Sequence, residues 1–349
     1  MKFSNKFKCL LAMPLLALAS NAVHAQEPIV LKFSHLTSAN SRLQQHVVEP
    51  WCNAIEKDSG GRLKCQIYPS MQLGGTPAQL VDQVKNGVAD VVWTAPGYTT
   101  GRFPRTEALE MPFTLPPTAV GGTNAMWEFT EKYAKDDYKD YELLALWSSS
   151  NLIISTTDKP TLTVESFKGL KLRSPSRFTS LFLTALGATP VTMPTGAITE
   201  ALSKGLVDGA MSSWEIIPTI KADEYTKYHM EGPATLPGFS QTPVVMLMNK
   251  GRYNSLPDDL KAVVDKNSGA VLVEMAAKVW EKGNEEAKNQ MIANGHKALT
   301  IKNSDYTAMA NVTTAAVEKE WIKQANARGL DGNKLIAEVR AIGKKHLPK

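Results

Sequence analysis

The stretch Phe167-Lys168-Gly169-Leu170-Lys171-Leu172-Arg173-Ser174-Pro175 predicts a short apolar strand that ends in an arginine. An arginine stays charged in a protein, so at a partly buried strand end it needs an anion nearby. Its planar fork of N–H groups matches a carboxylate in two parallel hydrogen bonds. Two interpretations of Arg173 are therefore open: a site for an organic acid, or a salt bridge to an acidic side chain of the same fold.

Short strands alternate with helices on both sides of this stretch. Apolar runs predict strands over residues 29–34, 63–68, 89–94, 143–147, 152–156, 170–173, 189–193, 209–212 and 244–249. Helices are expected up to residue 57, near residues 78–85, and without interruption from Pro257 to about Asn294. This alternation predicts an α/β fold with a largely parallel sheet, and a chain of 349 residues favours two domains.

The N-terminus has the features of an export signal. Residues 2–8 carry three lysines, the apolar run over residues 10–19 is too short to span a bilayer, and residues 23–25 have the small side chains of a cleavage site. We expect a signal peptide over residues 1–25, cut after Ala25, and a mature protein in the periplasm without stable membrane insertion. Its removal lowers the net charge from +5 to +2, because three lysines and no acids are lost. This weak charge argues against nucleic acid as a partner.

Two cysteines, Cys52 and Cys65, remain in the mature chain. An even number of cysteines in an exported protein favours a disulfide. Cys52 lies on the apolar face of a predicted helix and Cys65 in the strand that follows, so the spacing permits a bridge between the two. Two buried free thiols are the alternative. We expect no metal site, because no histidine lies at ligand spacing from either cysteine.

Catalytic signatures are missing from the sequence. It has no GxSxG, HExxH or Walker A motif, and no GxGxxG after a strand. His35 ends the first predicted strand, where it would either bind a ligand or form structural hydrogen bonds. We therefore predict no catalytic residue and no cofactor.

Several motifs occur in the order found in one family of transport receptors. They are residues 31–35, 59–64, 68–70, 72–75, 84–90, 111–113, 167–173, 206–209 and 254–257. On these residues the chain resembles the DctP-type solute-binding protein of a tripartite ATP-independent periplasmic (TRAP) transporter. The resemblance implies a two-lobed periplasmic solute-binding fold, with hinge strands and a long helix that spans both lobes.

The resemblance also implies how the chain is divided. Residues 26–150 would form the first part of lobe I, residues 151–239 lobe II, and residues 240–280 a return to lobe I with a hinge strand and the start of the long helix. Residues 281–349 would form C-terminal helices that pack mainly on lobe II. The implied partners are a small organic acid and the membrane permease subunits, and we expect a monomer.

For the ligand site, the resemblance assigns the ligand carboxylate to Arg173. Where the family often has an asparagine that bonds the ligand, this chain has Ser212, followed by Trp214. The remaining candidates are the residues near the expected cleft, which are Trp93, Tyr98, Phe113, Trp147, Asn151, His35 and Phe239. For each aromatic residue taken singly, core packing is the favoured role. As a group beside Arg173, they favour a carboxylate with an apolar or aromatic body.

We therefore predict a periplasmic receptor that captures a small organic acid and delivers it to a permease. Arg102 and Arg105 leave a dicarboxylate ligand open. The alternatives are a secreted α/β enzyme acting on a carboxylate and the binding protein of an ATP-driven importer.

Overall fold

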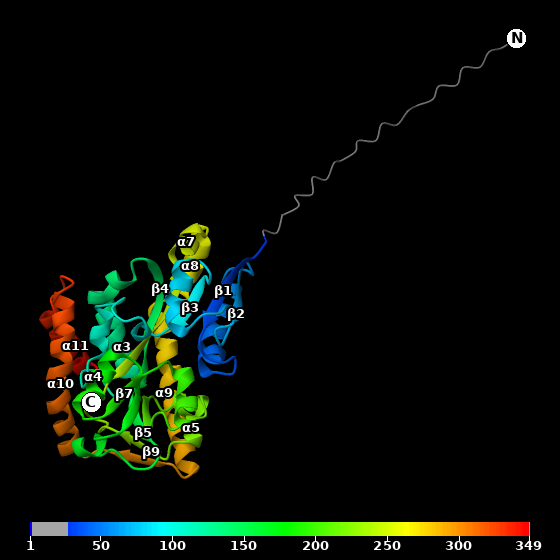
Figure 1. The fold of residues 1–349 in the computed structure, drawn as a ribbon. Coiled ribbons are helices and arrows are strands. Elements are labelled where there is room, and N and C mark those ends of the chain that lie inside the picture. The colour runs from blue at the N-terminus through cyan, green and yellow to red at the C-terminus, as the bar shows by residue number, and fades with distance from the viewer. Residues whose placement is uncertain (2–26, 349) are drawn as a thin grey trace.

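Two β-sheets form the centre of the molecule, one in each of two lobes (Figure 1). The computed structural model describes Met1 and residues 27–348, so the predicted signal peptide and its cleavage site lie outside the described residues apart from Met1. Lobe I is built on the strand order β2-β1-β3-β10-β4, and lobe II on the order β11-β9-β5-β8-β6-β7. The predicted two-lobed α/β fold is confirmed.

Both sheets are mixed, with parallel strands at the positions that the alternating pattern predicted. In lobe I, β1 is parallel to β2 and β3; in lobe II, β6 is parallel to β7 and β8. The strands of lobe I are β1 (Ile29–His35), β2 (Leu63–Tyr68), β3 (Val91–Thr94), β4 (Tyr141–Asn151) and β10 (Gln241–Asn249). Those of lobe II are β5 (Ile153–Thr156), β6 (Lys171–Ser174), β7 (Thr189–Thr192), β8 (Gly209–Ser212), β9 (Tyr228–Glu231) and β11 (Lys297–Thr300).

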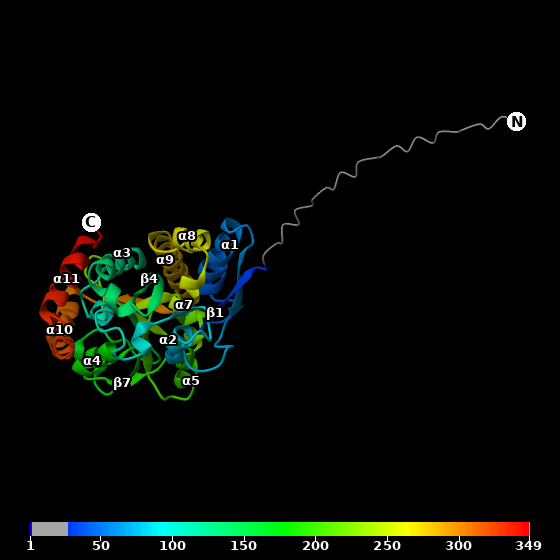
Figure 2. The same ribbon diagram turned by 90° about the horizontal axis from the view of Figure 1, so that it is seen from above.

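Helices cover both sheets, as Figure 2 shows from above. Because the sheets are covered, all four residues of β3 are buried, and the strand has an unbroken apolar run. The helices are α1 (Glu49–Asp58), α2 (Leu80–Lys85), α3 (Ala119–Phe129), α4 (Arg177–Ala185), α5 (Ile198–Ser203), α6 (Ile216–Thr219), α7 (Lys250–Ser255), α8 (Asp258–Lys266), α9 (Ala270–Ala293), α10 (Asn303–Asn326) and α11 (Gly332–Lys345). The helix α10 packs on α4, and α11 returns to α3.

Two neighbouring strands connect the lobes. The strand β4 of lobe I continues into β5 of lobe II with only Leu152 between them, and β10 pairs with β4 along its length. Ser150 has a φ of 77°, a left-handed conformation that non-glycine residues seldom adopt. The chain therefore bends where it passes from one sheet to the other, at the position of a hinge.

The long helix α9 also joins the lobes. It contacts β4 and α3 of lobe I and α6 and β11 of lobe II, and its 24 residues give it a length of about 36 Å. The prediction of one uninterrupted helix from Pro257 to about Asn294 is wrong, because α8 and α9 are separate. The break falls at Gly269, which has a φ of 61° and whose N–H donates to the carbonyl of Leu144.

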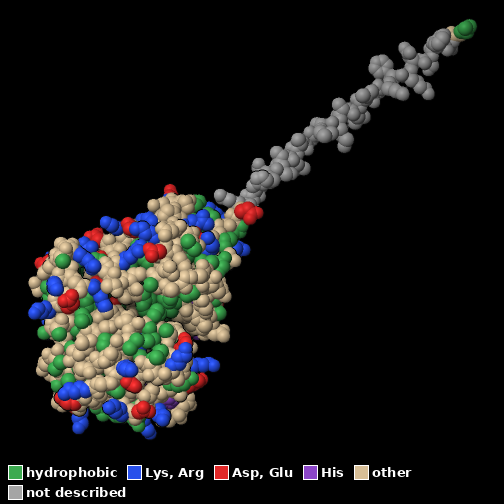
Figure 3. Space-filling model, viewed as in Figure 1, with side chains coloured by type: hydrophobic (Ala, Val, Ile, Leu, Met, Phe, Trp, Pro, Cys, Tyr) green, Lys and Arg blue, Asp and Glu red, His purple; other side chains and the backbone are tan. Residues whose placement is uncertain are grey.

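None of the helices within the described residues is long and apolar enough to cross a membrane. Figure 3 shows charged side chains toward both ends of the visible face and hydrophobic side chains gathered across its middle, at the waist between the lobes.

A disulfide joins Cys52 of α1 to Cys65 of β2, which confirms the predicted pairing. The bond ties the first helix of lobe I to β2, which lies at the edge of its sheet. It closes a loop with a sequence separation of 13 residues, and loops of this size restrict the unfolded chain appreciably.

We expect the paired substitution Cys52→Ser and Cys65→Ser to lower the free energy of unfolding by about 2 to 3 kcal/mol, because the unfolded chain gains freedom. Urea denaturation of the purified protein, with and without reductant, measures the change. An unchanged midpoint after reduction, with both thiols shown to be free by alkylation, would contradict this role.

Candidate ligand site

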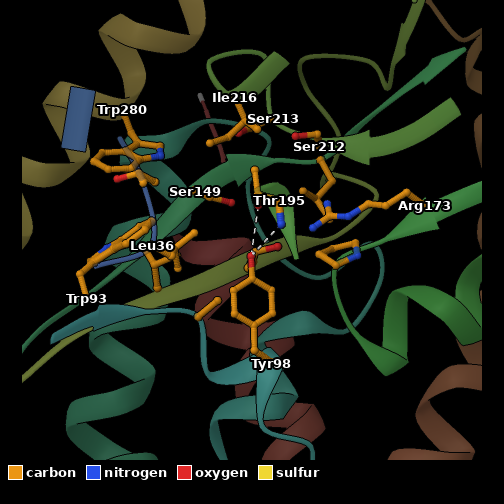
Figure 4. A pocket seen from close by; sticks show the side chains of 16 residues that line it. Leu36, Trp93, Tyr98, Ser149, Arg173, Thr195, Ser212, Ser213, Ile216 and Trp280 are labelled. Carbon is orange, nitrogen blue, oxygen red and sulfur yellow. Dashed lines mark hydrogen bonds between the residues drawn. The ribbon is translucent and has the colours of Figure 1, made fainter. Parts of the chain in front are cut away.

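A cavity of about 50 Å³ lies between the lobes, where the parallel strands of both sheets end (Figure 4). Ligands of open α/β sheets bind beyond the carboxyl ends of the strands, so this is the expected position for a site. The lining residues are Leu36, Thr37, Trp93, Ala95, Tyr98, Ser149, Leu152, Arg173, Pro175, Thr195, Ser212, Ser213, Ile216, Thr242, Val244 and Trp280. Both lobes, β4 and β10, and the long helix α9 contribute to the wall.

Arg173 is the charged side chain among these lining residues. It is only 2% exposed, and its position on β6, between β7 and β8, fixes where the side chain begins. Its Nε donates to the carbonyl of Met193 at 2.9 Å and its Nη1 to the carbonyl of Met211 at 2.8 Å. These two bonds hold the guanidinium plane.

The third nitrogen of this guanidinium, Nη2, is buried and has no hydrogen-bond partner within the described part of the chain. Among the same residues no carboxylate lies within 4.0 Å of Arg173, so the salt-bridge interpretation is wrong. Burial lowers the pKa of Arg173 to about 10, a shift that the nearby phenol of Tyr98 opposes. The group therefore remains a cation at neutral pH, with donor capacity directed at an anion.

Tryptophans form the opposite side of the cavity (Figure 4). The rings of Trp93 on β3 and Trp280 on α9 lie 6.3 Å apart, centre to centre. Trp147, which was predicted as a site residue, lies behind both rings, 6.4 Å from Trp93 and 5.7 Å from Trp280, and does not line the cavity. It supports the wall and does not form its surface.

Tyr98 contacts the other lobe directly across the cavity. Its phenol oxygen lies 3.1 Å from the hydroxyl of Thr195 and also accepts a hydrogen bond from the N–H of Thr195 at 3.5 Å (Figure 4). Tyr98 ends the turn η3 (Pro96–Tyr98) of lobe I, whereas Thr195 begins the turn η8 (Thr195–Ala197) beside β7 of lobe II. This contact links the lobes next to Arg173.

Three further predicted residues stand one layer behind the cavity. His35 is buried and its ring nitrogens lie 3.1 Å from Gln44 and 3.1 Å from Thr37, the second of which lines the cavity. Burial lowers the pKa of His35 to about 4, so the ring is neutral at pH 7. The indole N–H of Trp214 donates to Glu231 at 3.1 Å. Asn151 packs against Gly238, where an added Cβ would lie 2.2 Å from its Oδ1.

The structure places Phe113 and Phe239 away from the cavity. Their rings pack together at 6.0 Å and around Tyr306, at 5.0 Å and 4.9 Å, under the helix α10. The left-handed backbone of Phe113, with a φ of 56°, accompanies this inward packing, and its N–H donates to the carbonyl of Gly238. These two rings therefore pack in the core. Core packing was the alternative to ligand binding for each of them.

The two arginines that left a dicarboxylate open have other partners. Arg102 pairs with Asp82 at 2.6 Å, and Arg105 pairs with Asp136 at 3.1 Å and Asp137 at 3.3 Å. Neither lines the cavity, so this pair supplies no second cation beside Arg173.

Sequence reasoning missed several lining residues. Trp280 has the spacing of a core residue within a long helix, and Ser149, Thr195, Ser213 and Thr242 are small polar residues without a distinctive motif. Of these, Ser149 lies in a run of three serines, residues 148–150, which was the available signal.

The sequence matches the family of bacterial extracellular solute-binding proteins, family 7 (DctP), over residues 33–324. The match covers most of the chain, so the protein belongs to this family. It is a TRAP-type solute-binding protein of two lobes and not an enzyme.

Three solved structures are similar to the chain over nearly their whole length. One, from a marine metagenome and in complex with 3-hydroxybenzoate, is 39% identical with a TM-score of 0.87, covering 91% of this chain and 99% of that one. A TRAP solute-binding protein from Rhodoferax ferrireducens with copurified benzoate is 38% identical, TM-score 0.87, covering 91% and 98%. One from Bordetella bronchiseptica with bound (R)- and (S)-mandelate is 27% identical, TM-score 0.82, covering 91% and 99%.

A buried acid lies directly behind the Tyr98 turn. Glu110 is 3% exposed, and its Oε1 would be 2.7 Å from a Cβ added at Gly97. Burial raises the pKa of Glu110 to about 8; a hydrogen bond with Ser176 opposes the shift and the charge of Glu107 adds to it. The carboxyl is therefore mostly protonated at neutral pH.

We expect the contribution of Glu110 to the free energy of unfolding to fall as pH rises from about 4.5, where an unfolded glutamate ionises, to about 8, and then to level off, because the folded state holds this proton more tightly. Glu110→Gln should abolish this dependence, matching wild type at pH 4 and exceeding its free energy of unfolding by roughly 2 to 4 kcal/mol at pH 9. Denaturant titrations at pH 4, 7 and 9 measure it, with exposed Glu285→Gln as the control. Parallel pH profiles for Glu110→Gln and wild type would refute the assignment.

Proposed function

We propose that the protein is the periplasmic receptor of a TRAP transporter for an aromatic monocarboxylate. The observation that carries the proposal is the unpartnered Nη2 of Arg173, a buried cationic donor at a cavity whose opposite side is tryptophan. A carboxylate that accepts two parallel hydrogen bonds strongly stabilises a buried guanidinium. The rest of the wall offers apolar surface and hydroxyl groups.

A single carboxylate fits this wall better than two. Arg102 and Arg105 are held by acidic side chains outside the cavity, and a second ligand carboxylate would be desolvated without a cation. The flat rings of Trp93 and Trp280 favour a planar ligand body. The bound benzoate, 3-hydroxybenzoate and mandelate of the three similar proteins are acids of this class.

The roles of the remaining predicted residues follow from their positions. Tyr98 and Ser212 would contact the ligand near Arg173, and Trp93 would contact its ring. His35 and Trp147 would act through the lining residues that they contact, Thr37 and Trp280. Trp214, which follows the lining residue Ser213 in the chain, would act through its bond to Glu231. Asn151 would shape the hinge, and Phe113 and Phe239 the core behind it.

The ligand would be captured by closure of the two lobes. The wall is shared between the lobes, and the Tyr98–Thr195 contact joins them only when they are close together. A bend at Ser150 and the neighbouring strands β4 and β10 would supply the hinge. The closed form would be the one that a permease in the membrane recognises, with the receptor acting as a monomer.

We expect Arg173→Ala to weaken binding of benzoate by two to three decades or more, equivalent to roughly 3 to 5 kcal/mol, because the carboxylate would be desolvated without its partner. Arg173→Lys should also bind poorly, since an ammonium group cannot reproduce the planar fork. Isothermal titration calorimetry with benzoate, mandelate and succinate measures both effects and the monocarboxylate preference.

The control is Arg102→Ala, which removes an arginine of lobe I whose side chain pairs with Asp82 outside the cavity. It should leave benzoate affinity within a few-fold of wild type. If Arg173→Ala folds normally and still binds benzoate within a few-fold of wild type, the carboxylate does not lie at Arg173. Tighter binding of succinate than of every aromatic acid would contradict the ligand class.

A further inference from the structure

Unpartnered polar atoms lie on the tryptophan side of the cavity as well as on the arginine side. Within the described residues, the indole nitrogens of Trp93 and Trp280 and the hydroxyl of Ser149 are buried without a hydrogen-bond partner. All three side chains line the cavity. A buried polar group without a partner costs free energy, so these atoms need a partner that the cavity brings to them.

These atoms are held on the side away from Arg173. Figure 4 shows Arg173 at one side of the cavity, Trp93 and Trp280 at the other, and Ser149 between the two sides. Packing fixes the indole rings, because Trp280 is 2% exposed and its ring meets those of Trp93 and Trp147. Ser149 follows Ser148 on β4, whose backbone pairs with Pro243 of β10.

We propose that the aromatic acid bound here carries a hydroxyl group on its ring, recognised by Trp280, Trp93 and Ser149. The inference rests on the proposed function, because it assumes that the carboxylate lies at Arg173 and the ring points toward the tryptophans. It adds a second polar contact, which makes these three side chains specificity-determining residues of the site.

The chemistry of the three groups selects a hydroxyl over other ring substituents. An indole N–H only donates a hydrogen bond, whereas a serine hydroxyl both donates and accepts. A phenolic hydroxyl also donates and accepts, so it can satisfy both kinds of partner. A methyl or chloro group leaves the donors unsatisfied, and a second carboxylate would lack a cation among the lining residues on this side.

The first test compares ligands on the wild-type protein. Calorimetry with benzoate, 3-hydroxybenzoate, 4-hydroxybenzoate and 3-chlorobenzoate should show one of the hydroxylated acids binding about five- to tenfold more tightly than benzoate. The affinity of 3-chlorobenzoate should show no such gain over that of benzoate. Equal or weaker binding of both hydroxylated acids would overturn the inference, while benzoate binding itself would leave the proposed function standing.

The second test compares variants by one ratio: the affinity for the preferred hydroxylated acid divided by the affinity for benzoate. Trp280→Phe keeps a ring but removes the N–H, and Ser149→Ala removes the hydroxyl; each should cut the preference for the hydroxylated acid to about twofold or less. The matched control is Trp321→Phe on α10, which removes an indole N–H that is also buried and without a partner within the described residues but does not line the cavity. It should leave the ratio unchanged.

This affinity ratio distinguishes the loss of a hydrogen bond to the ring hydroxyl from a loss of packing, which would weaken both ligands. If Trp280→Phe and Ser149→Ala each weaken both ligands equally, the side chains act through packing alone and the inference is wrong. Thermal unfolding confirms that each variant is folded before it is titrated. Failure of every aromatic acid to bind the wild-type protein would instead overturn the proposed function, and with it the inference.

Discussion

The buried charge of Arg173 is the constraint on which the site depends. Burying a guanidinium until it is 2% exposed has a large desolvation penalty, and hydrogen bonds to two backbone carbonyls offset only part of this penalty. The third nitrogen has no protein partner within the described chain, so the protein alone does not complete the arrangement. In the proposed function a ligand carboxylate supplies the missing partner, and this contact contributes to the free energy of binding.

The fold places this cation at a wall that both lobes share. Arg173 belongs to lobe II, whereas Trp93 and Tyr98 belong to lobe I and Trp280 to the helix that joins them. Only the approach of both lobes excludes water from the contact and strengthens it. The left-handed Ser150 and the adjacent strands β4 and β10 put the bend beside the cavity, so the proposed closure would bring the lobes together at the ligand.

The sequence predicted the fold better than the site. Apolar runs located β2 and β8 at their observed bounds, but β9 (YHME) and β11 (KALT) were missed because polar and charged residues interrupt any apolar run in them. Arg173 was identified because an arginine is anomalous at a strand end. Phe113 and Trp280 show the limit: both have the pattern of core residues, and only the three-dimensional packing sends the first to the core and the second to the cavity.

The most direct test of the central claim is a crystal structure of the protein grown with benzoate. The account predicts a carboxylate oxygen within about 3 Å of Nη2 of Arg173, with the ring directed toward Trp93 and Trp280. A carboxylate bound elsewhere, or a guanidinium of Arg173 turned away from the ligand to an acidic side chain of the protein, would contradict it.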